Sequence, residues 1–325
     1  MRAVMVTGYG GTDVLELVEI EDPSPAEGQL LVDVTVAGVN FRDCYERQGA
    51  GYGGTPPFVT GAEGAGIVAA VGEGVSDVNV GDRVAWSQAP GSYAERVLVD
   101  AASAIPLPTG VSDEIAAAVL LQGMTAHYLS HDVYPVQDGD TVLVHAGAGG
   151  VGLLLTQMVR SRGGRVISTV STDDKADLAR AAGANETLPY EGFRERVREL
   201  TGGEGVAAVY DGVGKDTFDE SLLSLRVRGT MALYGASSGA VAPVDPRRLM
   251  RGGSLILTRP SLPHFTRTRA ELLARSGAVL TAVADGSLAV RIGGTYPLSD
   301  ARTAQDDLQA RRTTGKLLLA VRSME

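Results

Sequence analysis

The stretch Thr141–Gly152, TVLVHAGAGGVG, decides the fold of this chain. Within its first five residues, Val142, Leu143 and Val144 form a continuous apolar run, which is typical of a parallel strand covered on both faces. Its glycines, Gly147, Gly149 and Gly152, spell G-x-G-x-x-G, and helical spacing continues over Val151–Arg162. A strand, a glycine turn and a helix in this order predict a site for the diphosphate of a dinucleotide, because the helix start offers main-chain N–H groups. A glycine-rich turn that binds nothing is the alternative.

The composition is that of an ordinary globular protein of two domains. The chain has 325 residues, of which 44% are apolar and 21% charged, and this length is long for one core. A formal charge of −10 argues against a nucleic-acid or anionic-membrane surface, because both require a basic face. No apolar run approaches the length of a membrane span. The single cysteine, Cys44, excludes an internal disulfide, so we expect a cytoplasmic protein.

The first hundred residues are rich in strand signals. Short alternating or apolar runs are separated by Gly, Pro and Asp turns. The expected strands are Arg2–Val6, Leu15–Glu19, Gln29–Val36, Ala65–Val71, Asp82–Ala85 and Tyr93–Val99. This pattern predicts a small barrel. Because this β-rich module precedes a nucleotide-binding fold, we expect the module to contribute the substrate-binding part of the site.

Strands and helices alternate after about residue 118, which predicts an α/β Rossmann fold with a doubly wound parallel sheet. The expected strands after Thr141–His145 are Arg165–Val170, Glu186–Leu188, Val206–Tyr210, Thr230–Tyr234 and Ser254–Thr258. The expected helices after the first are Thr172–Ala182 and Phe193–Thr201. In such a fold the cofactor lies over the carboxyl ends of the strands.

The end of the second of these strands distinguishes NAD from NADP. An acidic side chain there hydrogen-bonds the ribose 2′-hydroxyl and repels a 2′-phosphate. Ser171 and Thr172 follow the strand and Lys175 comes one turn later, which suits a phosphate. Asp173 and Asp174 argue for NAD, although they also fit the first turn of a helix. The residues alone therefore leave both cofactors open.

A second motif points to a different chemistry. Gly235–Gly239, GASSG, matches the G-x-S-x-G of hydrolases, and Asp245 and His264 follow in hydrolase order. A nucleophile elbow must lead directly into a helix, whereas this motif leads into AVAPVDP, whose prolines oppose one. We therefore expect Ser237 and Ser238 to line a cofactor cleft instead.

Three stretches of the first part, GVNFRDCY (38–45), GAEGAG (61–66) and VGDRV (80–84), make the chain resemble the medium-chain dehydrogenase/reductase superfamily. The resemblance implies a β-rich GroES-like barrel in addition to the Rossmann domain. Zinc-dependent members carry a Cys ligand where this chain has Asn40 and a His ligand where it has Ala62. A catalytic zinc needs three protein ligands, so we expect no metal.

The same resemblance places Asn40 and Tyr45 beside the nicotinamide, with Tyr52 as a weaker candidate for the pocket wall. The structural alternatives are that Asn40 caps a turn and that Tyr45 packs at a helix start.

The resemblance narrows to the zinc-independent quinone oxidoreductase, or zeta-crystallin-like, branch in four motifs. These are VHAGAGGVGLLLTQ (144–157), VYDGVG (209–214), LTRPSL (257–262) and RRTTGK (311–316). The branch uses NADPH, with a lysine matching Lys175, and the resemblance implies a set of cofactor contacts. They are Phe41, Tyr45, Tyr128, Gly147, Gly149, Gly150, Val151, Ser171, Thr172, Lys175, Tyr190, Val213, Gly235, Ser237, Ser238, Ser261, Leu262 and Arg311. Two positions depart from the branch: Gly147 stands where relatives often have Ala, and Gln122 where several have Lys.

We therefore predict a zinc-independent, NADPH-dependent oxidoreductase that transfers hydride to quinones or α,β-unsaturated carbonyls. Without a metal, hydrogen-bond donors must take the negative charge that develops on the carbonyl oxygen. Tyr45 and Asn40 are the candidate catalytic residues. An enoyl-thioester reductase and a non-enzymatic NADPH-binding sensor or structural protein are the alternatives.

The chain returns to the first domain after Leu262. The expected elements there are the helices Arg269–Ala284 and Ser299–Arg311 and the strand Lys316–Val321. We expect residues 1–117 and 259–325 to form the catalytic domain and residues 118–258 the Rossmann domain. The apolar edge strand Ser254–Thr258 predicts pairing with a second copy. The expected partners are a small-molecule substrate and that second copy in a homodimer, with neither nucleic acid nor membrane.

Overall fold

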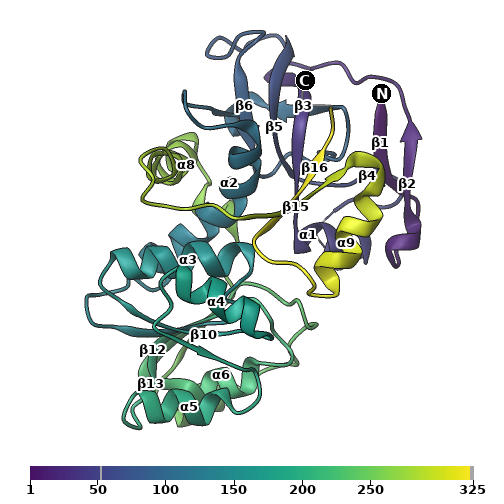
Figure 1. Ribbon diagram of the computed structural model, residues 1–325. Coiled ribbons are helices and arrows are strands. Elements are labelled where there is room, and N and C mark those ends of the chain that lie inside the picture. The colour runs from purple at the N-terminus through teal and green to yellow at the C-terminus, as the bar shows by residue number, and fades with distance from the viewer. Residues whose placement is uncertain (52, 323–325) are drawn as a thin grey trace. The chain divides into compact units, whose positions relative to one another are not determined.

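The computed structural model describes residues 1–51 and 53–322 and divides into two compact units (Figure 1). Unit 1 comprises Met1–Leu121 and Thr268–Glu325, and unit 2 comprises Gln122–Arg267. The first division falls after Leu121 rather than after residue 117, inside helix α2 (Asp113–Tyr128). That helix continues through the point where the sequence pattern changes. The second division falls after Arg267 rather than after residue 258, because the segment that follows the last strand stays with unit 2.

Unit 2 contains a six-stranded sheet in the order β11-β10-β9-β12-β13-β14, and all its neighbouring strands are parallel. The strands are β9 (Thr141–Val144), β10 (Arg165–Thr169), β11 (Glu186–Leu188), β12 (Val206–Asp211), β13 (Leu225–Leu233) and β14 (Ile256–Thr258). Figure 1 shows α3 (Gly150–Ser161) and α4 (Asp173–Ala181) on one face of this sheet, and α5 (Phe193–Leu200) and α6 (Phe218–Ser224) on the other. This order is typical of a Rossmann fold, and the predicted doubly wound parallel sheet is confirmed.

Most strands differ by one to three residues from their predicted bounds, and three of them begin elsewhere for reasons that the structure shows. β13 begins at Leu225 rather than Thr230. Its first half was not predicted, because its exposed side chains do not form an apolar run. β14 begins at Ile256 because the backbone at Ser254 has a φ of 57°, outside the strand region. β7 (Arg96–Asp100) begins after Tyr93, since the main chain at Tyr93 pairs with β1 and not with β3.

Unit 1 is built on two sheets. The larger has the order β15-β16-β3-β5-β6-β8, with β7 also paired to β3, and the smaller has the order β2-β1-β4. The bounds of the larger sheet are β15 (Ile292–Pro297), β16 (Lys316–Ala320), β3 (Gln29–Val39), β5 (Glu63–Val71), β6 (Arg83–Trp86) and β8 (Ile105–Pro106); those of the smaller are β1 (Arg2–Val6), β2 (Leu15–Glu19) and β4 (Phe58–Val59). Three further helices are α1 (Phe41–Arg47), α8 (Arg269–Ala284) and α9 (Ala301–Gln309).

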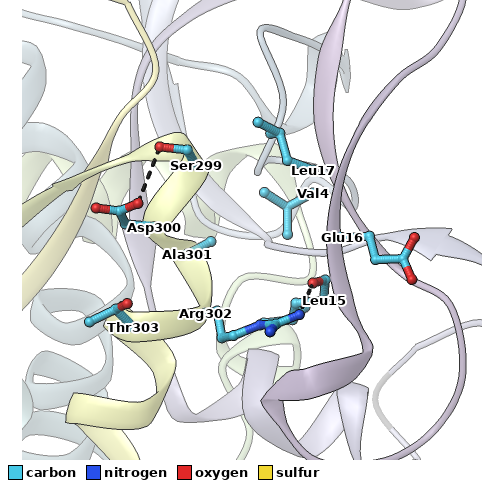
Figure 2. A pocket seen from close by; sticks show the side chains of 9 residues that line it. All are labelled: Val4, Leu15, Glu16, Leu17, Ser299, Asp300, Ala301, Arg302 and Thr303. Carbon is cyan, nitrogen blue, oxygen red and sulfur yellow. Dashed lines mark hydrogen bonds between the residues drawn. The ribbon is translucent and has the colours of Figure 1, made fainter.

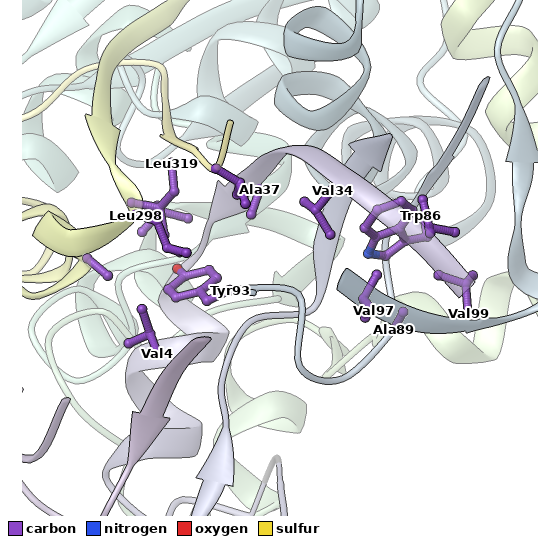
Figure 3. Packing of buried hydrophobic residues seen from close by; sticks show 14 of the residues in the cluster. Val4, Val34, Ala37, Trp86, Ala89, Tyr93, Val97, Val99, Leu298 and Leu319 are labelled. Atoms are coloured by element: carbon purple, nitrogen blue, oxygen red, sulfur yellow. The ribbon is translucent and has the colours of Figure 1, made fainter. Parts of the chain in front are cut away.

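The core of unit 1 joins segments from both ends of the chain (Figure 3). Trp86 and Tyr93 are fully buried in it, together with Leu298 and Leu319 from the C-terminal segment. Burying one large apolar side chain contributes about 1.5–3 kcal/mol. The C-terminal segment therefore belongs to this unit through its packing as well as through the antiparallel pairing of β16 with β3.

Candidate active site

The glycine turn of unit 2 joins β9 to α3 in a conformation that brings helix and turn into close contact. Gly149 is the N-cap of α3, with φ −80° and ψ 170°. A Cβ atom at Gly152 would lie 2.4 Å from the carbonyl oxygen of Ala146, so only glycine fits there. The N–H of Gly147 donates to Thr169 O at 3.0 Å and ties the turn to β10. The start of a twelve-residue helix at such a turn suits a phosphate group.

The end of β10 brings together the residues predicted to recognise a 2′-phosphate. Thr172 is the N-cap of α4, and its hydroxyl accepts the N–H of Lys175 at 3.3 Å. The ammonium of Lys175 donates to Ser171 Oγ at 3.4 Å. Asp173 and Asp174 are exposed in the first turn of the helix, the position that favours acidic side chains. The favourable interaction of acidic side chains with a helix N-terminus is therefore enough to explain Asp173 and Asp174.

Three further loops of unit 2, those after β11, β12 and β13, contain predicted cofactor residues. Tyr190 Oη accepts the N–H of Ala146, so it contacts the glycine turn at 3.1 Å. Ser238 Oγ donates to Val213 O at 2.8 Å, which joins the loop after β13 to the loop after β12. A Cβ atom at Gly235 would lie 2.4 Å from Gly212 O, so the two loops pack backbone against backbone.

The hydrolase motif does not form a nucleophile elbow. The residues that follow GASSG are irregular, and the next helix, α7, covers only Arg247–Arg251. The serine of a G-x-S-x-G nucleophile elbow lies on a turn that leads directly into a helix. The loop of Ser237 and Ser238 is held instead by main-chain hydrogen bonds to Gly212 and Val213.

A buried polar network links the strand ends beneath these loops. His145 contacts Thr169 Oγ1 through Nδ1 at 2.7 Å and Ser221 Oγ through Nε2 at 2.8 Å. Ser221 Oγ in turn donates to Asp211 Oδ2 at 3.1 Å, and Asp211 Oδ1 accepts the N–H of Val213. Burial lowers the pKa of His145 against the opposing effect of Asp211. The sequence analysis placed His145 only at the end of the predicted strand Thr141–His145; the missed signal is a polar residue that ends a buried apolar strand.

In unit 1, Asn40 lies at the N-terminus of α1 among charged side chains. It is 4% exposed. Its Nδ2 donates to Gly38 O at 3.2 Å and to Glu63 Oε2 at 3.0 Å, while its Oδ1 accepts from Lys316 Nζ at 2.8 Å. Both amide hydrogens of Asn40 are therefore directed at protein acceptors. The sequence analysis did not predict that Glu63 and Lys316 contact Asn40, although both residues lie in motifs on which the family resemblance rests.

Tyr45 and its neighbours on α1 complete this group. Tyr45 is partly exposed, and its ring centroid lies 6.2 Å from that of Phe41. Asp43, on the same helix, is fully buried and accepts hydrogen bonds from the Asn40 N–H and the Tyr93 hydroxyl, both at 2.9 Å. Burial raises the pKa of Asp43 to about 6. Of these residues, Tyr45 combines a polar hydroxyl with access to solvent.

The other predicted residues are spread over both units. Tyr128 is 2% exposed and stacks on Phe265 at 4.4 Å, in the short 3-10 helix Leu262–Phe265 that Ser261 begins. Arg311 is exposed and has a φ of 56°. Tyr52 lies outside the described residues.

Unit 1 contains a cavity of about 470 Å³ (Figure 2). It is lined by Val4, Leu15, Glu16, Leu17, Ser299, Asp300, Ala301, Arg302 and Thr303. In Figure 2 the guanidinium of Arg302 points at the main chain of β2, where it donates to Leu15 O at 3.0 Å. None of the predicted site residues lines this cavity, so it is not the candidate site.

Two observations concern membranes and metals. Within residues 1–51 and 53–322, no helix combines the length and the apolar character that crossing a bilayer requires. Over the same residues, no three or more His, Cys, Asp or Glu side chains gather in a way that could hold a metal ion.

The fold and the site define a two-domain dehydrogenase/reductase, and comparison with known proteins agrees. Residues 26–109 match the alcohol dehydrogenase GroES-like domain, and residues 150–272 match the zinc-binding dehydrogenase domain. Quinone oxidoreductase 1 of Escherichia coli (strain K12) is 41% identical over 316 residues, which cover 96% of this chain and 97% of that protein. The 2-haloacrylate reductase of a Burkholderia species is 40% identical over 98% of both chains.

A solved structure extends this likeness to three dimensions. Escherichia coli quinone oxidoreductase in complex with NADPH superposes with a TM-score of 0.97 at 40% identity, covering 99% of this chain and 100% of that one. The chain therefore belongs to the quinone oxidoreductase family of the medium-chain dehydrogenases/reductases.

The name of the matching zinc-binding domain implies a metal, but the residues present do not fit one. Ala62 is 1% exposed and has no atom that could bind zinc. The Oδ1 of Asn40 faces the ammonium of Lys316, which also lies 2.5 Å from Glu63 Oε2. Burial lowers the pKa of Lys316 and Glu63 opposes this shift, so the basic group already occupies the place that a metal would need beside Asn40.

Proposed function

We propose that this chain is an NADPH-dependent reductase of quinones or α,β-unsaturated carbonyls. The observation that carries the proposal is its likeness, over nearly the full length, to a quinone oxidoreductase solved with NADPH. The 40% identity to a 2-haloacrylate reductase supports the wider substrate class, because a haloacrylate also has an activated double bond.

The residues of unit 2 suit NADPH. The glycine turn and the start of α3 would hold the diphosphate, and Ser171, Thr172 and Lys175 would hold the 2′-phosphate. Tyr190, Val213 and Ser238 line the neighbouring loops. The cofactor, when bound, supplies the hydride.

The protein must then stabilise the charge that develops on the acceptor. Reduction of a quinone or an enone builds negative charge on a carbonyl oxygen, and one well-placed donor contributes about 3 kcal/mol to stabilising it. We assign this role to the Tyr45 hydroxyl, which is partly exposed. Asn40 would act indirectly, since both its amide hydrogens are directed at protein oxygens and its main-chain N–H binds Asp43 at the start of α1.

The test is steady-state oxidation of NADPH with a panel of acceptors: 9,10-phenanthrenequinone, 1,4-benzoquinone, an alkenal and crotonyl-CoA. Turnover with quinones or the alkenal supports the proposal. Turnover with crotonyl-CoA alone would show an enoyl-thioester reductase. Tight NADPH binding without turnover on any acceptor would show a non-enzymatic binding protein.

We also propose that two copies pair through β14, at the open edge of the Rossmann sheet. β14 pairs with β13 on one side only within the described residues. Ile256, Val227 and Met250 are 54%, 68% and 65% exposed, an unusual degree for side chains of this kind close to a sheet edge. Sedimentation at micromolar concentration tests this: we expect a dimer for the natural chain and a monomer for Ile256→Asp. A monomeric natural chain would refute the pairing.

A cytoplasmic location is the last part of the proposal. It is supported by the lone cysteine, Cys44, which is buried and unpaired with any second cysteine. Fractionation of cells that express the natural chain tests it.

A further inference from the structure

The small sheet of unit 1 has an open edge at β2. Its order is β2-β1-β4, so β2 pairs with β1 on one side only within residues 1–51 and 53–322. The N–H of Val4 donates to Tyr93 O at 2.8 Å and its carbonyl accepts the N–H of Thr60 at 3.1 Å, both on the side of β1 away from β2. Leu17 is opposite Val4 in the antiparallel register, so it directs its own N–H and C=O to the open edge.

One cationic side chain of the protein already binds to this edge. Arg302, near the start of α9, donates to Leu15 O at 3.0 Å and to Asp13 O at 3.1 Å. Leu15 lies two residues before Leu17, so its carbonyl faces the same way. Among the described residues, the outward N–H and C=O of Leu17 have no such partner. An unpaired strand edge of this kind is a template for a further strand.

The open edge borders the cavity of about 470 Å³ that Figure 2 shows. Leu17 lines the cavity from the sheet, and Asp300 and Ala301 line it from the start of α9. Residues directly opposite in a sheet share a face, yet Val4 is 3% exposed and Leu17 is 43% exposed. The cavity therefore leaves an apolar side chain uncovered beside unpaired main-chain groups. Its volume is within the range of about 300–1,000 Å³ that ligand sites have.

The segment that contains β2 is acidic. Among residues 12–23, five are Asp or Glu and none is Lys, Arg or His. Asp22 is paired with the N-terminal ammonium and with an arginine. Glu16 and Glu19 are exposed and lie on opposite faces of β2, because they are three residues apart. Asp300 adds an exposed carboxylate on the other side of the cavity. A strand that approached this edge would therefore meet negative charge on both of its faces.

We propose that β2 binds an extended, basic segment of a partner protein as an added strand. The main chain of Leu17 pairs with this segment, the cavity receives one of its side chains, and its lysine or arginine side chains lie near Glu16 and Glu19. A second copy of this chain is a poor occupant, because two β2 edges would bring like charges together. A basic strand is complementary to the edge in both charge and hydrogen bonding. The proposal does not depend on the reductase function.

The test is the fluorescence anisotropy of labelled octapeptides added to the full chain. The probe alternates lysine and valine. One control peptide replaces lysine by glutamate, and a second keeps the lysines but has every main-chain amide N-methylated, so that it lacks the donors. We expect the probe to bind with a Kd at least about tenfold below that of either control, and to bind more weakly at high salt. No binding of the probe would show that the acidic side chains only protect the edge, and equal binding of the N-methylated peptide would show charge attraction alone; either result would overturn the proposal.

Variants of the chain locate the binding on β2. Glu16→Lys reverses a charge at the edge, and Leu17→Pro removes an outward N–H without taking a hydrogen bond from the pairing with β1. We expect each to raise the Kd of the probe at least about tenfold. The matched control is Glu204→Lys, which makes the same change of charge at an exposed position of unit 2 and should change the Kd by less than about twofold. Thermal unfolding shows whether each variant is folded. An unchanged Kd in folded Glu16→Lys overturns the proposal, whether or not Leu17→Pro folds.

Sedimentation of the same variants detects a second copy on this edge. The dimer proposed above pairs through β14, so Ile256→Asp should be monomeric and Leu17→Pro should remain a dimer. A dimer that persists in Ile256→Asp and is lost in Leu17→Pro would place a second copy on β2, and the proposal of a basic partner segment would be wrong.

Discussion

Replacing Lys175 tests the assignment of NADPH most directly. Its ammonium lies 3.4 Å from Ser171 Oγ at the end of β10 and is partly exposed to solvent. A phosphate carries nearly two negative charges, and each charge pair at about 4 Å contributes about 1 kcal/mol in water. Lys175→Met should therefore weaken NADPH binding by about 2 kcal/mol, or about 30-fold. Lys175→Glu replaces attraction by repulsion and should weaken it by up to about 1,000-fold.

The assay is the ratio of the dissociation constants for NADH and NADPH, measured by calorimetry for the natural chain and each variant. NADH lacks the 2′-phosphate, so its affinity should stay nearly unchanged. The matched control is Arg180→Met, which removes the same charge from α4 further along the helix, where Arg180 binds Asp177. The effect should shrink at 1 M salt, since the Debye length falls to about 3 Å. An unchanged ratio in Lys175→Glu would show that this residue does not recognise the phosphate.

Three further changes test other parts of the structure. Tyr45→Phe should lower turnover on an enone by more than about tenfold with little change in the Kd for NADPH, because a lost donor costs about 3 kcal/mol; equal turnover would exclude the hydroxyl. Gly147→Ala should destabilise unit 2 by about 1–3 kcal/mol, because its Cβ would lie 1.7 Å from Ser168 Oγ, and Ser168→Ala in the same chain should restore part of the loss in thermal unfolding. Burial raises the pKa of Asp43 from 3.8 to about 6, so the folded state binds this proton more tightly than the unfolded state does. The resulting stability is complete below about pH 4 and is lost as the pH rises through 6, by about 3 kcal/mol. Urea unfolding of Asp43→Asn should lack this part of the pH dependence, and an unchanged pH dependence would contradict the buried, proton-binding carboxyl.

The elements that the sequence predicted well are those with a strong local signal. The Rossmann strands around the glycine turn are short apolar runs bounded by turn residues, and α8 has the expected bounds, Arg269–Ala284. Such a pattern can be recognised within one segment of the sequence, because the spacing of its apolar residues follows from the face of the strand or helix that the core covers.

The missed elements lack that local signal. α2 (Asp113–Tyr128) is apolar on nearly all sides, and so it shows no helical alternation of apolar and polar positions. The first half of β13 contains the exposed residues Arg226, Val227 and Arg228. This part of the strand therefore has no apolar run from which a strand could be predicted. Tertiary contacts decide the extent of both elements.

The buried ion pair of unit 1 cannot be predicted from the pattern of any single segment of the sequence. Lys316 is 276 residues from Asn40 and 253 residues from Glu63. Each looks ordinary in its own segment, since a lysine before an apolar strand and a glutamate in a glycine-rich run are common at surfaces. Only the pairing of β16 with β3 and of β3 with β5 brings them together. Because a buried charge is tolerated only with its partner, the three positions are constrained jointly. The missing zinc ligands could be recognised at Asn40 and Ala62 one residue at a time, whereas the contacts of Lys316 with Asn40 and Glu63 could be found only in the folded chain.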